Sequence, residues 1–320
     1  MTIDMHTHLA VREFYPEPFW DGYVRLNASW RPATTTLEEA MAEARRNVLP
    51  TYWDSDGTGH VRRMDEAGIE KAVILHMDQG LLFGERDGGK TIEQQNKQVS
   101  EAAKKYPDRL IYFCGVDPRR EQAVELLERC VTEWGARGIK MYPSTGFLPA
   151  DREAYPFYER ASAWKIPVYF HMGPQDSPYK NEGNTHPSVL LRVLVDFPDL
   201  TVIVAHMGLE FWRDLIALGK VRENVMCDFC AWQIIARRDY SQFCYILRRF
   251  LDEFGRERVM FGTDAPLLEH SISSKRWVEI VRNLPHQSPE RYRFTEEEVS
   301  ALLDGNARRL LASIPQKIAS

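Results

Sequence analysis

The stretch DMHTHL, residues 4–9, ends a short apolar run that begins at Thr2. In an extended strand, side chains two residues apart point to the same face, so His6 and His8 can reach one point while Thr7 faces away. Two neutral imidazoles that converge in this way form half of a metal site. The pattern predicts a metal centre, provided that further ligand-type residues follow other strands.

Length and composition predict a globular protein that acts on small molecules. With 320 residues, 44% hydrophobic and 27% charged, the chain can build a large core, and we expect a single domain over residues 1–320. Its net charge of −5 provides no basic surface for nucleic acid or anionic lipid. No apolar run has the length of a membrane span, no signal-peptide pattern precedes the histidines, and the five cysteines do not resemble a disulfide framework. These features predict a cytoplasmic protein without nucleic-acid or membrane partners.

Short apolar runs alternate with amphipathic stretches along the chain, which is typical of βα units around a parallel sheet. We predict eight strands, at residues 2–8, 72–76, 110–116, 138–142, 167–171, 201–206, 224–228 and 258–264. Helices are predicted at residues 94–106, 120–134, 155–164, 187–196, 240–254 and 295–311. This order favours an α/β fold of the (β/α)8 TIM-barrel type. An open doubly wound sheet is the alternative, disfavoured because no glycine-rich loop follows the first strand.

An aromatic-rich insertion, residues 10–60, follows the first strand. It contains one predicted helix, residues 37–48, with Thr36 as N-cap and Glu39 completing a capping box. Because the insertion leaves the carboxyl end of a strand, it lies on the face where barrel active sites are found, and we predict that it forms a lid. Packing of its aromatic residues against the barrel is the alternative, and both can hold. A second loop, residues 78–90, is glycine-rich and polar and is also predicted to close over the site.

Ligand-type side chains end three further strands. His171, His206 and Asp264 each follow an apolar run, and a Gly or Pro comes two residues later in each case. A barrel brings the carboxyl ends of its strands to one rim, where these side chains would meet His6 and His8. A single such residue is often a turn residue or a helix cap. Five of them at four strand ends predict a metal site.

These motifs resemble the amidohydrolase superfamily, and more closely its amidohydrolase-related branch, which includes aminocarboxymuconate-semialdehyde and resorcylate decarboxylases. The likeness is carried by IDMHTH (3–8), IPVYFHMG (166–173), the segment from FPDL to HMG (197–208), VMFGTDAP (259–266) and GNARRL (305–310). The resemblance implies a TIM barrel with a divalent metal, usually zinc, held by His6, His8, His171 and Asp264. It also implies that His206 is the catalytic acid/base, and it makes a homodimer an expectation.

The chemistry of these residue types agrees with that assignment. Imidazoles with one carboxylate suit Zn²⁺, with Mn²⁺ or Fe²⁺ as alternatives, and leave an open position for water whose pKa the metal lowers. His206 would take a proton from that water or hydrogen-bond the substrate. Asp264 could bind the metal with one oxygen and pass a proton with the other, either to a leaving group or to a substrate carbon. Both residues are therefore predicted to be catalytic.

Two further residues at strand ends are predicted to bind substrate. Lys140 ends the fourth strand, where an ammonium group can hold a substrate carboxylate. In binuclear amidohydrolases a carboxylated lysine bridges two metals at this place, and that alternative stays open. His76 ends the second strand, where a packing role is equally compatible. Glu210 is interpreted as a carboxylate in the first turn of a helix or an orienting group. Asp228, at the end of the seventh strand, is interpreted as a residue of the rim or, alternatively, as a cap or solvated carboxylate.

The sequence therefore favours a metal-dependent hydrolase of a small carboxylate-bearing compound, with aromatic acids among the candidates. A metal-activated water would attack with His206 as acid/base. Non-oxidative decarboxylation of the same substrate class is the alternative, and a binuclear enzyme with carboxylated Lys140 is a third option. A nuclease of a related barrel type is disfavoured by the acidic charge.

Overall fold

Eight parallel strands form one sheet in the computed structural model, which describes residues 1–84, 88–174, 182–316 and 318. The strands are β1 (Ile3–Thr7), β2 (Lys71–Leu75), β3 (Leu110–Gly115), β4 (Ile139–Met141), β5 (Val168–Phe170), β6 (Val202–Val204), β7 (Val225–Asp228) and β8 (Val259–Met260). Each strand pairs with the next along the chain. Backbone hydrogen bonds from Met5 to Phe261 (2.9 Å) and from His8 to Ala265 (2.8 Å) join β1 to the segment after β8. The sheet therefore forms a nearly closed barrel, and the predicted (β/α)8 TIM-barrel fold is confirmed.

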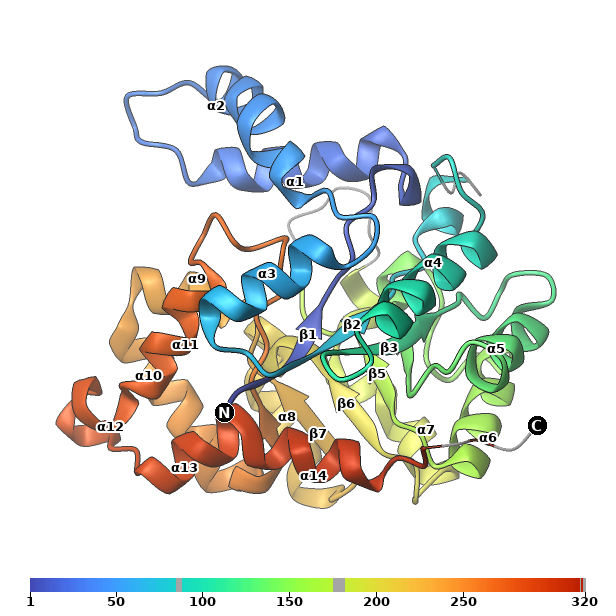
Figure 1. The fold of residues 1–320 in the computed structure, drawn as a ribbon. Coiled ribbons are helices and arrows are strands. Elements are labelled where there is room, and N and C mark those ends of the chain that lie inside the picture. The colour runs from blue at the N-terminus through green and yellow to red at the C-terminus, as the bar shows by residue number, and fades with distance from the viewer. Residues whose placement is uncertain (85–87, 175–181, 317, 319–320) are drawn as a thin grey trace.

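Helices surround the barrel (Figure 1). They are α1 (Glu17–Ser29), α2 (Leu37–Glu43), α3 (Thr58–Ala67), α4 (Ile92–Lys105), α5 (Ala123–Thr132), α6 (Tyr155–Trp164), α7 (Leu191–Asp196), α8 (Trp212–Val221), α9 (Trp232–Arg238), α10 (Tyr240–Arg249), α11 (Ser274–Arg282), α12 (Leu284–Gln287), α13 (Glu296–Ser300) and α14 (Asn306–Ser313). Wider, π-type turns continue α2, α10 and α13, at Ala44–Val48, Phe250–Gly255 and Ala301–Gly305. The helices predicted at residues 37–48, 240–254 and 295–311 are therefore each built from more than one helical segment.

The helix ranges predicted from the sequence do not include α1, α3, α8, α9, α11 and α12. In α1, the buried side chains of Phe19, Trp20, Val24 and Ala28 repeat at helical spacing and share one face. Aromatic density and Pro18 made this segment look like an irregular insertion. Pro18 is compatible with the helix because it occupies the first turn, where the missing N–H has no partner to lose.

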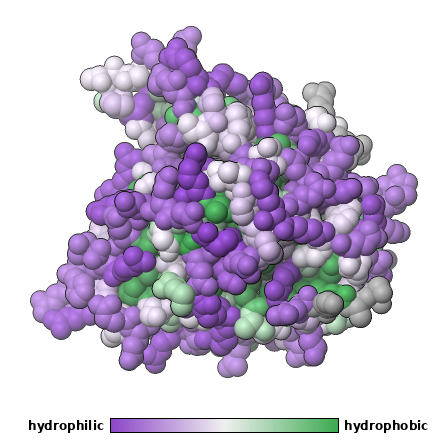
Figure 2. Space-filling model, viewed as in Figure 1, coloured by the Kyte–Doolittle hydropathy of each residue, from purple (hydrophilic) through white to green (hydrophobic). Residues whose placement is uncertain are grey.

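The core lies inside the barrel and between the barrel and its helices. Strands β5 and β6 are fully buried along their whole length, as expected for parallel strands covered on both faces. Side chains on the face viewed in Figure 2 are mostly hydrophilic. Within the described ranges, no helix is both long enough and apolar enough to cross a membrane.

Residues 10–60 leave the carboxyl end of β1, and helices α1 and α2 project beyond the barrel (Figure 1). The Trp20 and Trp53 rings meet edge to face with centroids 4.6 Å apart, and Tyr52 donates a hydrogen bond to the Leu267 carbonyl at 3.1 Å. The aromatic residues thus pack within the insertion and against the segment after β8. The predicted capping box of α2 is present. Of the second predicted loop, residues 85–87 lie outside the described residues, and Gly80–Phe83 forms a 3-10 turn.

Candidate active site

His6 in β1 and His8 just after it are oriented through their Nδ1 atoms. His8 Nδ1 lies 2.7 Å from the Leu75 carbonyl oxygen, and His6 Nδ1 lies 3.1 Å from Oδ2 of Asp228. A carbonyl oxygen only accepts, so His8 Nδ1 carries the proton and Nε2 presents a lone pair. The ionised Asp228 carboxylate is also an acceptor, and it imposes the same tautomer on His6. Both rings therefore offer Nε2, as metal-binding histidines with such partners do.

Asp264 completes a group of three with the two histidines. Its Oδ1 lies 3.0 Å from His8 Nε2 and 3.9 Å from His6 Nε2, and one ligand atom from each residue lies within 4.8 Å of the others. Burial opposes ionisation of Asp264, but the contacts with His8 and His6 outweigh it and hold its pKa well below the usual range. Burial, aided by the Lys140 charge, lowers the pKa of His6 to about 3. The group thus consists of a carboxylate and a neutral His6 ring beside His8.

The contact between His8 Nε2 and Asp264 Oδ1 shows how well a metal fits here. Because His8 Nδ1 already donates to Leu75, both atoms of the contact carry lone pairs in the neutral ring. Their approach to 3.0 Å requires either a second proton on His8 or a cation that both atoms bind. Two imidazole nitrogens and a carboxylate oxygen are a common donor set for divalent transition metals. The residues present therefore fit a divalent metal.

His206 follows β6 at a strained point of the backbone, with φ of 61°. Trp232 Nε1 donates a hydrogen bond to the backbone carbonyl oxygen of His206 at 2.6 Å, and this bond holds the conformation. The ring lies between two partners, with Nδ1 2.9 Å from Sγ of Cys230 and Nε2 3.1 Å from Nδ1 of His171. Burial lowers the pKa of His206. The ring is therefore neutral at pH 7 and fixed in orientation.

His171 lies beside His206 and outside the three-residue group. Its ring stacks on Tyr142, with centroids 4.2 Å apart and planes 13° from parallel. Within the described ranges, two sets of ligand-type atoms lie close enough to hold an ion: His6, His8 and Asp264, and His6, His206, Asp228 and Cys230. His171 is in neither set. Its metal-binding role therefore stays a prediction.

The interpretation of Asp228 as a solvated carboxylate is wrong, whereas the alternative of a residue at the rim of the barrel agrees with its position. Asp228 ends β7 and is fully buried. Its Oδ2 accepts hydrogen bonds from His6 Nδ1 and from the Tyr169 hydroxyl, and its Oδ1 accepts one from the Cys230 backbone at 2.8 Å. The carboxylate therefore holds the His6 ring at Nδ1 and directs Nε2 towards Asp264. Sequence patterning could place Asp228 at a strand end, but it could not pair it with a histidine on another strand.

Asp4 and Gly262 are two further residues whose roles the sequence did not reveal. Asp4 Oδ1 accepts hydrogen bonds from the backbone N–H groups of His6 and Thr263, each at 3.1 Å, and ties β1 to the segment that carries Asp264. Burial raises the pKa of Asp4 to about 8. A Cβ atom on Gly262 would lie 2.9 Å from Cβ of His6, which is closer than side chains approach. Only glycine lets the two segments meet at this distance.

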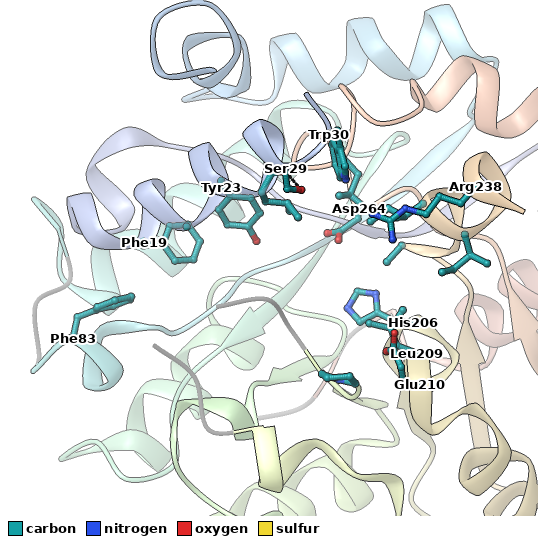
Figure 3. Close-up of a pocket in the computed structure, with 17 residues that line it drawn as sticks. Phe19, Tyr23, Ser29, Trp30, Phe83, His206, Leu209, Glu210, Arg238 and Asp264 are labelled. Atoms are coloured by element: carbon teal, nitrogen blue, oxygen red, sulfur yellow. Dashed lines mark hydrogen bonds between the residues drawn. The ribbon is translucent and has the colours of Figure 1, made fainter. Parts of the chain in front are cut away.

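A cavity of about 250 Å³ opens beside His206 and Asp264 (Figure 3). The cavity is lined by α1 and the residue after it, by α9, by the 3-10 turn after β2 and by the segments after β6 and β8. The lining residues include Phe19, Tyr23, Leu26, Trp30, Phe83, Leu209, Glu210, Ile234, Ile235, Arg238 and Leu268. Most of these side chains are apolar or aromatic. In Figure 3, the Tyr23 hydroxyl and the Asp264 carboxylate point towards the same open space. The cavity thus joins an apolar wall to the polar strand ends.

Lys140 and His76, both predicted to bind substrate, are buried and are not among the residues that line this cavity. Lys140 Nζ lies 4.9 Å from the centroid of the Tyr169 ring and has no hydrogen-bond partner in the described part of the chain. Burial lowers its pKa from 10.5 to about 8. The His76 ring packs edge to face against Phe14, with centroids 5.4 Å apart. Both substrate-binding roles stay predictions.

The fold and the converging ligand atoms define a metal-dependent TIM-barrel enzyme. A family model described as amidohydrolase matches residues 3–312. The chain belongs to the amidohydrolase family, and the branch that the sequence motifs resemble is confirmed. No curated protein sequence matches the chain.

Several solved structures share the fold over nearly the whole chain. A TIM-barrel protein of uncharacterised function from Bordetella bronchiseptica is 23% identical, with a TM-score of 0.67 and 98% and 99% of the two chains covered. The 2,6-dihydroxybenzoate decarboxylase from Rhizobium is 19% identical, with a TM-score of 0.64 and 97% and 98% covered. The 5-carboxyvanillate decarboxylase from Novosphingobium aromaticivorans, complexed with manganese and a nitrobenzoic acid, is 19% identical, with a TM-score of 0.66 and 98% and 96% covered. At these identities the likeness establishes the fold, and a divalent metal is consistent with it.

Proposed function

We propose that the protein is a metal-dependent, non-oxidative decarboxylase of a small aromatic carboxylate. The observation that carries the proposal is the cavity, whose aromatic and aliphatic wall leads to Asp264 and His206 at the strand ends. Such a wall suits a planar ring, and the polar end suits its carboxylate. The structural neighbours support decarboxylation better than the hydrolysis that the sequence favoured, since several are decarboxylases of ring acids.

His6, His8 and Asp264 would hold the metal, with His171 as the predicted fourth ligand. The donor set suits Zn²⁺, Mn²⁺ and Fe²⁺, and we favour Mn²⁺ because solved relatives contain manganese. A bound cation would supply positive charge that orients the substrate carboxylate and stabilises the negative charge developing on the ring. Asp228, Leu75 and Asp4 keep the ligands in place through the hydrogen bonds described above.

Decarboxylation breaks the bond between the ring and the carboxylate, leaves its electron pair on the ring carbon and requires a proton at that carbon. Asp264 and His206 both line the cavity and titrate. Because the pKa of Asp264 is low, its carboxylate must first accept a proton, from water or from a ring hydroxyl, before it returns one to the carbon. The neutral His206 would hydrogen-bond the substrate and hold it against Asp264. We assign the delivery of a proton to the ring carbon to Asp264. We assign the positioning of the substrate, together with proton exchange, to His206.

Helix α1 supplies Phe19 and Tyr23 to the cavity wall, and Trp30 follows the end of this helix. These contacts support the proposal that residues 10–60 form a lid within a single domain. A closed lid would exclude water from the ring carbon and so favour carbon protonation over hydrolysis. Lys140, buried without a hydrogen-bond partner in the described ranges, would add positive charge beneath the substrate carboxylate.

The test uses manganese-loaded protein with 2,6-dihydroxybenzoate, 5-carboxyvanillate and the methyl esters of both acids. Release of CO₂ with formation of the decarboxylated ring supports the proposal. Cleavage of the esters without CO₂ from either acid contradicts it and returns the assignment to hydrolysis. Asp264→Asn should abolish CO₂ release, whereas Glu210→Gln, which changes an exposed carboxylate on the same cavity, should retain it.

A further inference from the structure

Cys230 connects the buried Asp228 carboxylate to the His206 ring. It follows β7 by two residues, its backbone N–H donates to Oδ1 of Asp228 at 2.8 Å, and its thiol also hydrogen-bonds that carboxylate. In addition, Sγ lies 2.9 Å from Nδ1 of His206, and Nε2 of His206 lies 3.1 Å from Nδ1 of His171. All four side chains are buried. They therefore form a continuous chain of hydrogen bonds from Asp228 to His171.

The thiol proton of Cys230 sets the direction of this chain at its first step. Burial raises the pKa of Cys230, so the sulphur keeps its proton at neutral pH. Burial opposes ionisation of Asp228, but its contacts with His6 and His206 outweigh that effect and hold its pKa below the usual range. An ionised carboxylate is a stronger acceptor than a neutral imidazole nitrogen. The thiol therefore donates to Asp228, and a lone pair of the sulphur is left to accept a hydrogen bond from His206.

The remaining steps follow from the single proton that each neutral imidazole carries. Burial keeps His206 neutral, and with the sulphur as its acceptor the ring has its proton on Nδ1 and a lone pair on Nε2. The hydrogen bond between Nε2 of His206 and Nδ1 of His171 then requires that Nδ1 of His171 is the donor. A neutral His171 ring consequently has its lone pair on Nε2, which is the tautomer already assigned to His6 and His8.

We propose that Cys230 is a positioning residue that transmits the orientation set by Asp228 through His206 to His171, so that His171 presents the lone pair of Nε2 to a metal ion. Asp228 then prepares two ligands, His6 by a direct hydrogen bond and His171 through the thiol of Cys230. The positions of the protons do not depend on the reaction. The consequence for metal binding rests on the proposed function, in which His171 is the fourth ligand.

The tautomers are measured by NMR on the full-length, metal-free protein with ¹⁵N-labelled histidine, because the nitrogen shift distinguishes a protonated from an unprotonated ring nitrogen. Signals are assigned by their loss in His171→Gln and His206→Gln. The unmodified protein should carry the proton on Nδ1 of both rings. In Cys230→Ala, Nδ1 of His206 loses its acceptor, and a buried N–H without an acceptor is costly. Both protons should therefore move to Nε2.

Cys230→Ser should keep the original tautomers, because a hydroxyl can donate to Asp228 and accept from His206 in the same way. Manganese affinity is measured on the same proteins by competition with a chelator. It should fall about tenfold in Cys230→Ala, the lower end of the effect of groups that hydrogen-bond a ligand, since Cys230 acts through His206. Cys230→Ser should restore it.

Cys227→Ala is the matched control. It truncates a fully buried cysteine of the same strand, one that points to the opposite side from Asp228, and it should change neither the tautomers nor the affinity. Four results would overturn the proposal: a proton on Nε2 of His206 in the unmodified protein, unchanged tautomers in Cys230→Ala, no restoration by Cys230→Ser, or an equal loss of affinity in Cys227→Ala. Moved protons with unchanged manganese affinity would keep the chain and reject His171 as a ligand, so the two failures are distinguishable.

Discussion

Asp228 accepts a hydrogen bond from Nδ1 of His6 at 3.1 Å, across 222 positions of sequence. The contact joins the end of β7 to β1 and fixes which nitrogen of His6 faces Asp264. The carboxylate also accepts hydrogen bonds from Tyr169 and from the Cys230 backbone, so each of its oxygens is engaged. A carboxylate behind a histidine increases the basicity of the ring and fixes its direction, and both effects strengthen metal binding.

Asp228→Asn should weaken metal binding while leaving the fold intact. The amide has nearly the same shape, but its NH₂ group cannot accept, so one of the donors around Asp228 loses its acceptor. We expect manganese affinity to fall about 10-fold to 100-fold, measured by competition with a chelator. Asp239→Asn, which changes a carboxylate at the start of α10, should keep the original affinity. Equal affinity in Asp228→Asn and the unmodified protein would show that Asp228 has no part in the metal site.

Removal of His6 in β1, or of His8 just after this strand, should abolish tight metal binding. His6→Ala and His8→Ala each delete a predicted ligand. We expect the metal affinity to fall more than about 100-fold, since loss of a group that only hydrogen-bonds a ligand already lowers it by up to that factor. His76→Ala removes another buried histidine and should retain the metal. His171→Ala in the same assay tests the predicted fourth ligand: a loss as large as that of His6→Ala supports the role, and an unchanged affinity excludes it.

Gly262→Ala should destabilise the protein because the added methyl group has no space. Its Cβ would lie 2.9 Å from Cβ of His6 and 3.0 Å from Cβ of Cys230. Overpacking of this kind costs about 1–3 kcal/mol of the free energy of unfolding, measured with urea. Gly305→Ala is the control, because the nearest atom to its Cβ would be at 3.8 Å. Similar stability of both variants would show that β1 and the segment after β8 can separate without cost.

The sequence was sufficient to predict the barrel and the residues at its rim. Continuous apolar runs specify strands covered on both faces, and the parallel order then brings His6, His8, His206 and Asp264 together. These predictions depend on local periodicity and on one topological rule. For that reason they hold even where strand ends differ from the structure by several residues.

The supporting contacts could not be predicted in the same way. The partnership of Asp228 with His6 and that of Cys230 with His206 depend on how neighbouring strands are aligned, which periodicity does not determine. Helix α1 was missed because its aromatic residues and Pro18 are also common in loops. Contacts between residues that are far apart in the sequence are therefore the part of the site that local sequence patterns do not predict.

Lys140→Met should change two pH dependences that follow from the lowered pKa of the buried ammonium. Between pH 8 and 10.5 the unfolded chain keeps the lysine proton and the folded chain has lost it, so folded stability rises with pH across this window. Urea unfolding of the metal-free variant should lack this rise. Binding of a carboxylate by the unmodified protein should weaken as pH passes about 8, because the ammonium becomes neutral, and the variant should lack that step.

Lys97→Met provides the control, since Lys97 is exposed on α4 and its loss should leave both pH dependences in place. The two measurements also separate the proposed roles of Lys140. An ammonium group that binds substrate gives the step in carboxylate binding near pH 8 and leaves the metal content unchanged in Lys140→Met. A carboxylated lysine that bridges two metals would carry a negative charge, so it would show no such step, and its removal would lower the metal content per chain. A binding step with unchanged metal content is the result that we expect.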